Sequence, residues 1–137
     1  MAITTGQDIL AADVKAIAAV TVTIFMNGAD ALTTTDIGVD WIPEKCNGWV
    51  LTSAVGLCAG GSSSGNVTIL VKKNGTSMLS TNITIEAGET SSRTATTQPV
   101  IDTAQDDVAT GDKIEVSNSS AGTGVTYCCA QLTFTKP

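Results

Sequence analysis

Apolar and polar residues alternate along most of this chain, and the alternation predicts β-strands. Residues 20–26 place Val, Val, Ile and Met on one face of an extended segment, and Thr, Thr and Phe on the other. Residues 49–59 and 67–73 continue the same two-residue period. We expect the core-facing side of residues 49–59 to carry Trp49, Leu51, Val55 and Leu57.

A turn signal between two of these runs predicts a hairpin. Asn74-Gly75 separates residues 67–73 from residues 78–85, and both runs are rich in β-branched side chains. An Asn-Gly pair in this position is the strongest short-range hairpin signal, because both turn residues must take a positive φ. We expect Ile83 and Ile85 of the returning strand to point inward.

The remaining segments complete an all-β pattern. A short edge strand is expected within residues 33–40, and the Thr-rich residues 91–100 are expected at an edge. Loops are expected at 60–65, 102–112 and 117–124, around a short strand at 114–116. The last strand is expected at 125–134, with Cys128, Ala130, Leu132 and Phe134 inward. About eight strands with turns at this spacing predict a single antiparallel β-sandwich over residues 20–137.

Residues 1–19 are a separate N-terminal arm with the one helical pattern of the chain. Thr5 with Asp8 three positions later resembles a capping box, and apolar residues follow at helical spacing. A short Ala-rich helix is marginal alone and needs a partner surface. Two interpretations stay open: packing on its own sandwich, or docking on neighbouring subunits. The candidate contact residues are Ile9, Leu10, Val14 and Ile17.

Charge narrows the classes of partner. The chain has 137 residues, 7 basic and 13 acidic side chains and a net charge of −6. Nucleic acids and anionic membranes both require clustered Lys and Arg, so neither is expected as a partner. No run approaches the roughly 20 apolar residues that span a bilayer, and the N-terminus lacks the pattern of a secretion signal.

The four cysteines do not form a metal-binding pattern. Cys46, Cys58, Cys128 and Cys129 lack zinc-ligand spacing, and the chain contains no histidine to complete a mixed site. Buried, reduced thiols are the preferred interpretation, since the chain carries no secretion signal. A Cys46–Cys128 or Cys58–Cys128 disulfide stays open if the strands concerned are neighbours.

The inventory of reactive side chains argues against catalysis. Without histidine, Ser-His and Cys-His pairs are excluded, together with most catalytic zinc sites. The acids that cluster in sequence could serve a glycosidase or hold calcium only if the fold brought them together. Solvated turn acids are the preferred interpretation, and no enzyme activity, metal or cofactor is expected. These acids are Asp102, Asp106, Asp107, Asp112 and Glu115.

Three segments resemble a known family. They read VTILVKKNGTSML, ITIEAGETSSRTATT and DVATGDKIEVSNSSAGTGVTYCCAQLTF. Together with the opening MAITTGQDILAADVKAI, they are similar to the small jelly-roll domains of tailed-bacteriophage virion proteins. Those domains occur in head decoration proteins, head fibres and tail-fibre or baseplate subunits. The resemblance implies a homotrimer that acts through its surfaces and carries no catalytic residues.

The resemblance gives a leading hypothesis and an alternative. The leading one is a capsid decoration (cement) protein that binds the major capsid protein or other virion proteins, and resides in a virion assembled in the host cytoplasm. The alternative is a tail-fibre, baseplate or head-fibre subunit that binds a host glycan through Trp41, Tyr127 and the loops 60–65 and 117–124. Trp49 is expected in the core instead. A secreted, disulfide-bonded cellular module is a third class.

Overall fold

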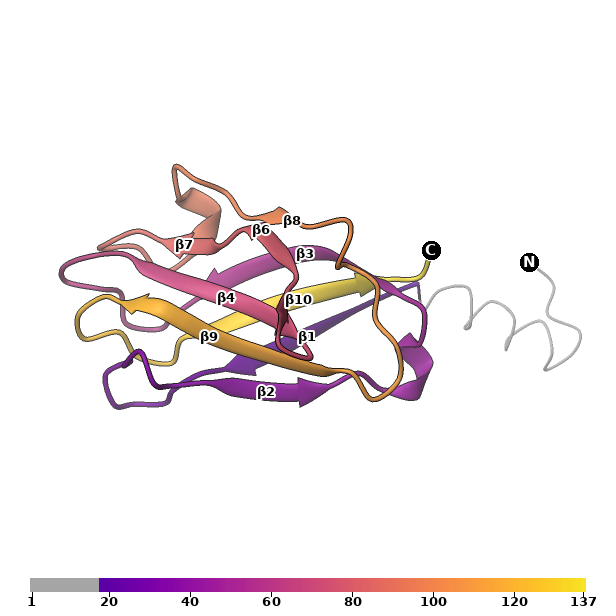
Figure 1. The fold of residues 1–137 in the computed structure, drawn as a ribbon. Helices are drawn as coiled ribbons and strands as arrows, with labels where there is room; N and C mark the ends of the chain where they lie inside the picture. Colours follow the sequence, from indigo (N-terminus) through magenta and orange to yellow (C-terminus); the bar gives the residue numbers. More distant parts are fainter. Residues whose placement is uncertain (1–17) are drawn as a thin grey trace, which may run out of the picture.

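The computed structural model describes residues 18–137, and these form an all-β sandwich of antiparallel sheets (Figure 1). The candidate arm contacts Ile9, Leu10, Val14 and Ile17 lie outside the described residues. The strands are β1 (Ala19–Phe25), β2 (Gly38–Trp41), β3 (Val50–Leu57), β4 (Val67–Lys73), β5 (Thr76–Ser77), β6 (Leu79–Thr81), β7 (Ile83–Ile85), β8 (Val100–Ile101), β9 (Lys113–Ala121) and β10 (Cys129–Thr135). Two short 3-10 helices are η1 (Glu44–Cys46) and η2 (Ser92–Thr94).

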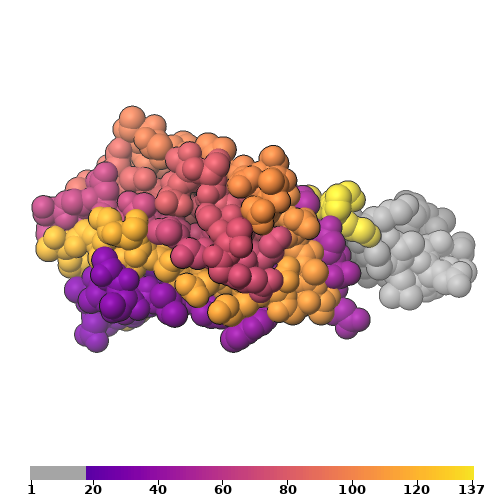
Figure 2. Space-filling model, in the orientation of Figure 1, coloured from indigo at the N-terminus to yellow at the C-terminus, as the bar shows by residue number. Residues whose placement is uncertain are grey.

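The order of the strands is that of a double-sheet jelly roll. One sheet has the order β1-β10-β3, and the other β2-β9-β4, with β5 and β7 both pairing with β4. The first and last strands are therefore neighbours, and the chain alternates between the sheets from β1 to β4. The β2-β9-β4 sheet faces the viewer in Figure 2, where β9 lies between the other two strands. The predicted all-β sandwich is confirmed.

The core lies between the two sheets and follows the alternation in the sequence. In β4, Val67, Ile69 and Val71 are completely buried, while the residues between them stay half-buried on the other face. Strand β10 contributes alternate residues from the opposite sheet, among them Leu132 and Phe134. Trp49 is buried as expected.

The Asn-Gly hairpin is confirmed, but the strand that returns from it is interrupted. Asn74 and Gly75 have φ values of 50° and 89°, as a two-residue hairpin turn requires. The Asn74 side chain donates to Asp112 Oδ1 (2.9 Å) and accepts from the Lys113 N–H (3.0 Å), which ties the turn to the start of β9. After β5 the chain leaves β4, pairs with β8 as β6, and rejoins β4 as β7. Ile83 and Ile85 are buried, as predicted.

The expected inward face of residues 49–59 is wrong beyond Leu51. The β3–β10 register shifts between Thr133 and Phe134, which leaves Thr52 as an extra residue in β3. A β-bulge of this kind moves the following residues to the other face. Ala54 and Gly56 therefore face the core, while Val55 and Leu57 are only half-buried.

The Thr-rich residues 91–100 do not form the expected edge strand. They contain η2 and loop, and β8 begins only at Val100. The Ser91 hydroxyl accepts from the Arg93 N–H (3.1 Å), and the Gln98 amide donates to the carbonyls of Ser92 (2.9 Å) and Ala95 (2.8 Å). Because side chains here satisfy the backbone locally, they compete with a strand ladder.

The expected loop at 117–124 and the expected start of the last strand at residue 125 are also wrong. Strand β9 continues through the Ser- and Asn-rich segment to Ala121, because this segment extends the ladder with β4, whereas β2 pairs only with residues 113–116. Asn118 lies buried within β9 and donates its amide to the Thr33 carbonyl (3.0 Å). Tyr127 has a φ of 48°, so the extended backbone of β10 begins only at Cys129.

Candidate interaction site at the open edge

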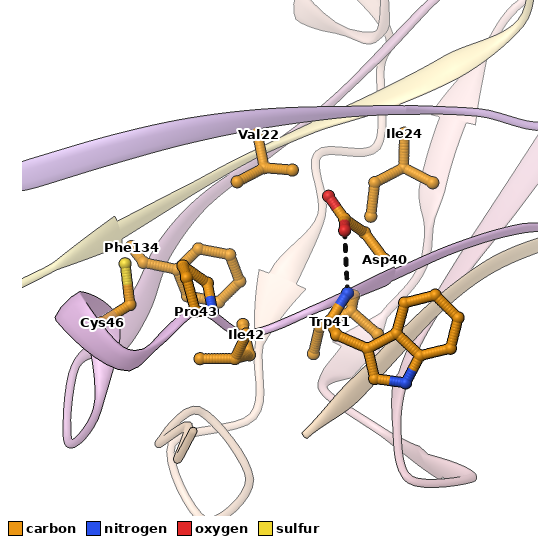
Figure 3. A pocket seen from close by; sticks show the side chains of 9 residues that line it. Val22, Ile24, Asp40, Trp41, Ile42, Pro43, Cys46 and Phe134 are labelled. Carbon is orange, nitrogen blue, oxygen red and sulfur yellow. Dashed lines mark hydrogen bonds between the residues drawn. The ribbon is translucent and has the colours of Figure 1, made fainter. Parts of the chain in front are cut away.

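An apolar groove lies where the two sheets meet at one edge of the sandwich (Figure 3). Its volume is about 220 Å³. Strand β1 forms one wall of the groove, and β2 together with the residues that follow it, through η1, forms the other. The lining residues are Val22, Ile24, Asp40, Trp41, Ile42, Pro43, Cys46, Ile114 and Phe134.

The groove exists because β1 and β2 touch at one end and then separate. Gly38 lies so close to β1 that an added Cβ would meet the Phe25 carbonyl oxygen. From Gly38, β2 runs to Trp41, and Pro43 ends the strand because it has no N–H to donate. Along β1 the same divergence leaves Val22 half-buried, whereas Ile24 is only 5% exposed.

A carboxylate and an indole mark the mouth of the groove. Trp41 is 60% exposed, and its backbone N–H donates to Asp40 Oδ1 (2.8 Å), as Figure 3 shows. Asp40 is the one charged residue in the groove lining. The indole thus offers apolar area for contact, and the carboxylate offers a site for a cation or a hydrogen-bond donor.

Within residues 18–137, no strand pairs with the outer edge of β1. The Met26 N–H donates to the Cys128 carbonyl (2.9 Å) and the Lys136 N–H to the Ala18 carbonyl (2.8 Å). This register turns the even-numbered backbone groups toward β10 and leaves those of Thr21 and Thr23 at the outer edge, while the Phe25 carbonyl lies against Gly38. Strand β1 contains no charged residue and no proline. Such an edge is a template for contact with another chain.

The two aromatic residues predicted for a glycan site are both exposed, but they lie far apart. Trp41 ends β2, whereas Tyr127 precedes β10, and these positions are at opposite ends of the sandwich in Figure 1. Tyr127 lies beside the loops named with it, since Gly60 bridges to Thr126 and the Ser63 N–H donates to the Thr123 carbonyl (3.0 Å). The structure therefore groups Tyr127 with the loops and Trp41 with the groove.

The acidic residues are spread over separate local contacts. Within residues 18–137, no three His, Cys, Asp or Glu side chains are grouped to hold a metal ion. Asp107 pairs with Lys73 (3.5 Å), Asp102 Oδ1 accepts from the Ala104 N–H (2.9 Å), and Asp112 Oδ2 from the Ala109 N–H (2.9 Å). These contacts fold the 102–112 loop.

All four cysteines are buried and free, so neither of the two candidate disulfides is present. The β3–β10 register pairs Cys129 with Leu57, which makes Cys58 and Cys128 neighbours at the end of the ladder. Burial raises the pKa of the Cys128 thiol to about 12, with smaller contributions from Cys58 and Cys129. Burial likewise raises the pKa of Cys46, and Lys45 opposes this shift.

Comparison of the chain with protein-family models, with curated proteins and with solved structures finds no match. No helix in residues 18–137 is long and apolar enough to cross a bilayer. The groove was not foreseen from the sequence: of its lining residues, only Trp41 had been predicted for binding. Pro43 marks the end of β2 in the sequence, but no sequence signal indicates that β1 and β2 diverge.

Proposed function

We propose that this chain is a non-enzymatic structural protein of a tailed-bacteriophage virion, which forms homotrimers and decorates the capsid. The open edge carries the proposal: the outer edge of β1, which pairs with no strand of residues 18–137, an apolar groove and an exposed Trp41 make one surface suited to protein contact. The family resemblance of the three quoted segments supports the virion context. The jelly-roll arrangement agrees with the fold that this resemblance implies.

The physical mechanism is added buried area between capsid subunits. A rigid sandwich core fixes the geometry of the exposed edge, so that binding orders few further side chains. Three copies around a threefold axis present three arms, and each arm contacts a different capsid subunit. Apolar area buried at these contacts, at about 25 cal/mol per Å², opposes the separation of capsid subunits under internal pressure.

Sedimentation with emptied capsids of the phage that encodes the chain tests this proposal. We expect the chain to cosediment, to saturate at a fixed number of trimers per shell, and to raise the temperature at which the shell ruptures. As a control, the variant Thr96→Ala, in the segment between η2 and β8, should bind the shells as well as the unaltered chain does. A chain that stays in the supernatant at every shell concentration, or that leaves the rupture temperature unchanged, contradicts the proposal.

One observation favours the alternative of a tail-fibre, baseplate or head-fibre subunit that binds a host glycan. Tyr127 is 48% exposed and is held by its left-handed backbone beside the loops 60–65 and 117–124. An exposed aromatic ring on a fixed backbone can stack on a sugar. A glycan array decides between the two: hits that Tyr127→Ala abolishes support the alternative.

A further inference from the structure

Two of the buried cysteines lie opposite each other where β3 ends and β10 begins (Figure 1). The β3–β10 ladder finishes with Cys129 opposite Leu57, so the next step along both strands places Cys58 opposite Cys128. Residues opposite each other in a sheet project to the same face. Both of these side chains belong to the hydrophobic core between the sheets, where Cys58 is 8% exposed and Cys128 is completely buried.

The backbone hydrogen bonds show that the two cysteines form a non-hydrogen-bonded pair of the ladder. The Cys128 N–H donates to Asn27 Oδ1 (2.8 Å), and its carbonyl accepts from the Met26 N–H (2.9 Å). Both backbone groups of Cys128 therefore face β1. The Cys58 N–H donates to the Thr90 carbonyl (3.0 Å), on the edge of β3 away from β10.

A pair of this kind fits the geometry of a disulfide. In antiparallel sheets its Cα atoms lie about 4.5 Å apart, with the side chains close together. Disulfides join cysteines whose Cα atoms are about 4.4–6.8 Å apart. The strands therefore hold the two sulfur atoms within reach of each other.

The other two thiols do not compete for either partner. Cys129 follows Cys128 directly and so projects to the opposite face of the sheet. Cys46 lines the β1–β2 groove together with Phe134. Phe134 lies six residues from Cys128 along the chain, which is roughly 20 Å in an extended strand.

We propose that Cys58 and Cys128 form an oxidisable pair, which hydrogen peroxide converts to a disulfide in the folded protein. The structure describes the reduced form, in which all four thiols are free. The inference goes beyond the proposed function and does not depend on it, because it concerns two strands of one chain. A reducing compartment keeps the pair as thiols, and an oxidising one joins the strands.

The oxidation proceeds in two steps. A peroxide meets Cys58 first, because Cys58 is the less deeply buried of the pair. The Cys58 sulfur attacks one peroxide oxygen, the O–O bond breaks, and a sulfenic acid and one water form. The Cys128 sulfur then attacks the Cys58 sulfur: the S–S bond forms, the S–O bond breaks, and the hydroxyl leaves with the Cys128 proton as a second water. The two thiols together lose two electrons, which the peroxide takes up.

Burial controls the rate of this oxidation. Burial raises the pKa of the Cys58 thiol, and it raises the pKa of the Cys128 thiol to about 12. Because the thiolate is the nucleophile, oxidation should be slow near neutral pH and should accelerate as the pH rises.

The disulfide would fix the end of the sandwich that carries Tyr127. Tyr127 directly precedes Cys128, and Gly60, two residues after Cys58, bridges to Thr126. The bond closes a loop of about 70 residues, from 58 to 128, which restricts the unfolded chain far more than the folded one. We therefore expect the oxidised protein to unfold at a urea concentration about 1–2 M higher than the reduced protein.

Peroxide treatment of the folded chain, followed by labelling with N-ethylmaleimide in denaturant and mass measurement, tests the proposal. Before treatment all four thiols should take up the label. After treatment only two should, and the unlabelled chain should be lighter by two hydrogen atoms. Dithiothreitol should restore four labelled thiols and the lower urea midpoint. Retention of four labelled thiols, a chain that gains oxygen without a bridge, or an unchanged midpoint in the bridged chain contradicts the proposal.

Matched variants identify the pair. The double variant Cys46→Ala, Cys129→Ala keeps only Cys58 and Cys128 and should still form the bridge. Cys58→Ala should form none, although it retains three thiols. Each variant is compared with its own reduced form, since alanine in the core lowers stability by itself. Fragmentation of peptides from the unaltered chain assigns the bridged residues without any substitution. A bridge that persists in Cys58→Ala, or that joins another pair in the unaltered chain, overturns the inference.

Discussion

The two long edges of the sandwich are built in opposite ways. At the β1–β2 edge the strands diverge and leave an apolar groove. At the β3–β7 edge, the segment between β7 and β8 covers the junction of the sheets. There Ser92 is buried and its hydroxyl accepts from the Gly56 N–H (2.9 Å), while Ser91 bridges to Leu57. Within residues 18–137, the chain covers one of these edges and leaves the other open.

Polar contacts hold the covering segment in place. The Glu86 carboxylate accepts from the Thr96 N–H (3.0 Å), and this hydrogen bond lowers the pKa of Glu86. The amide of Gln98 donates to the Ser92 and Ala95 carbonyls. At the open edge, the corresponding backbone donor, the Trp41 N–H, is satisfied by its neighbour Asp40. Because that bond is local, β2 is not tied to β1.

We expect the largest difference in the free energy of unfolding between the same substitution made in the core and at the groove. Val67→Ala removes two methyl groups from a completely buried site and should lower the free energy of unfolding by about 2 kcal/mol. Val22→Ala, at the open edge, should cost less than about 1 kcal/mol, because Val22 is half-buried. Urea denaturation at one fixed chain concentration measures both. Equal losses would mean that the groove is as well packed as the core.

Alanine substitutions at two glycines test how closely the two sheets pack at the covered edge. A Cβ at Gly56 would lie 2.8 Å from Ile83 Cγ2 and 2.9 Å from Ile69 Cδ1. Gly56→Ala should therefore destabilise by about 1–3 kcal/mol through overpacking. Gly28→Ala is the matched control, since open space surrounds that position, and we expect a change within about 0.5 kcal/mol. Thermal or urea unfolding distinguishes the two; a tolerated Gly56→Ala contradicts the close approach.

The thiols should respond differently to pH and to alkylation. The pKa of Cys128 is raised to about 12 from an ordinary value of 9.0, so the unfolded chain loses this proton first. The native state then binds more protons than the unfolded state between these values, and stability should fall as pH rises from about 9 to 12. Cys128→Ala should flatten that part of the stability curve.

Alkylation mapped by mass spectrometry extends the comparison to the groove. In the native protein at pH 8.5, Cys46 should react before Cys128: both thiols are buried, but Cys46 lines the groove and Cys128 does not. Equal rates that match global unfolding would show that the groove does not admit the reagent.

The smallest effect on stability is expected at the mouth of the groove. Trp41 is exposed, so Trp41→Ala should change the free energy of unfolding by no more than about 0.5 kcal/mol. Thr35→Ala, in the loop that precedes β2, is a control at another exposed site. A loss above about 1 kcal/mol would show that Trp41 packs within its own chain.

Local signals predicted much of the fold. The alternation of residues 67–73 correctly gave the buried face of β4, and Asn74-Gly75 gave the hairpin turn, because both depend on neighbouring residues alone. The polar residues 117–121 misled the prediction, since pairing with β4 holds them in β9. The sequence did not predict the bulge at Thr52, because a bulge depends on how β3 pairs with β10 and not on β3 alone.

The amino-acid sequence by itself determined that this protein is an all-β sandwich and that histidine chemistry is absent, whereas it left open two disulfides that are absent from the structure. Only the tertiary structure decided which edge is covered and which is open. Strand character comes from period-two alternation within one segment, whereas the groove comes from the distance between β1 and β2, twelve residues apart in sequence. That distance is set by Gly38 at one end and by the course of the chain after Pro43 at the other, and no local pattern encodes it.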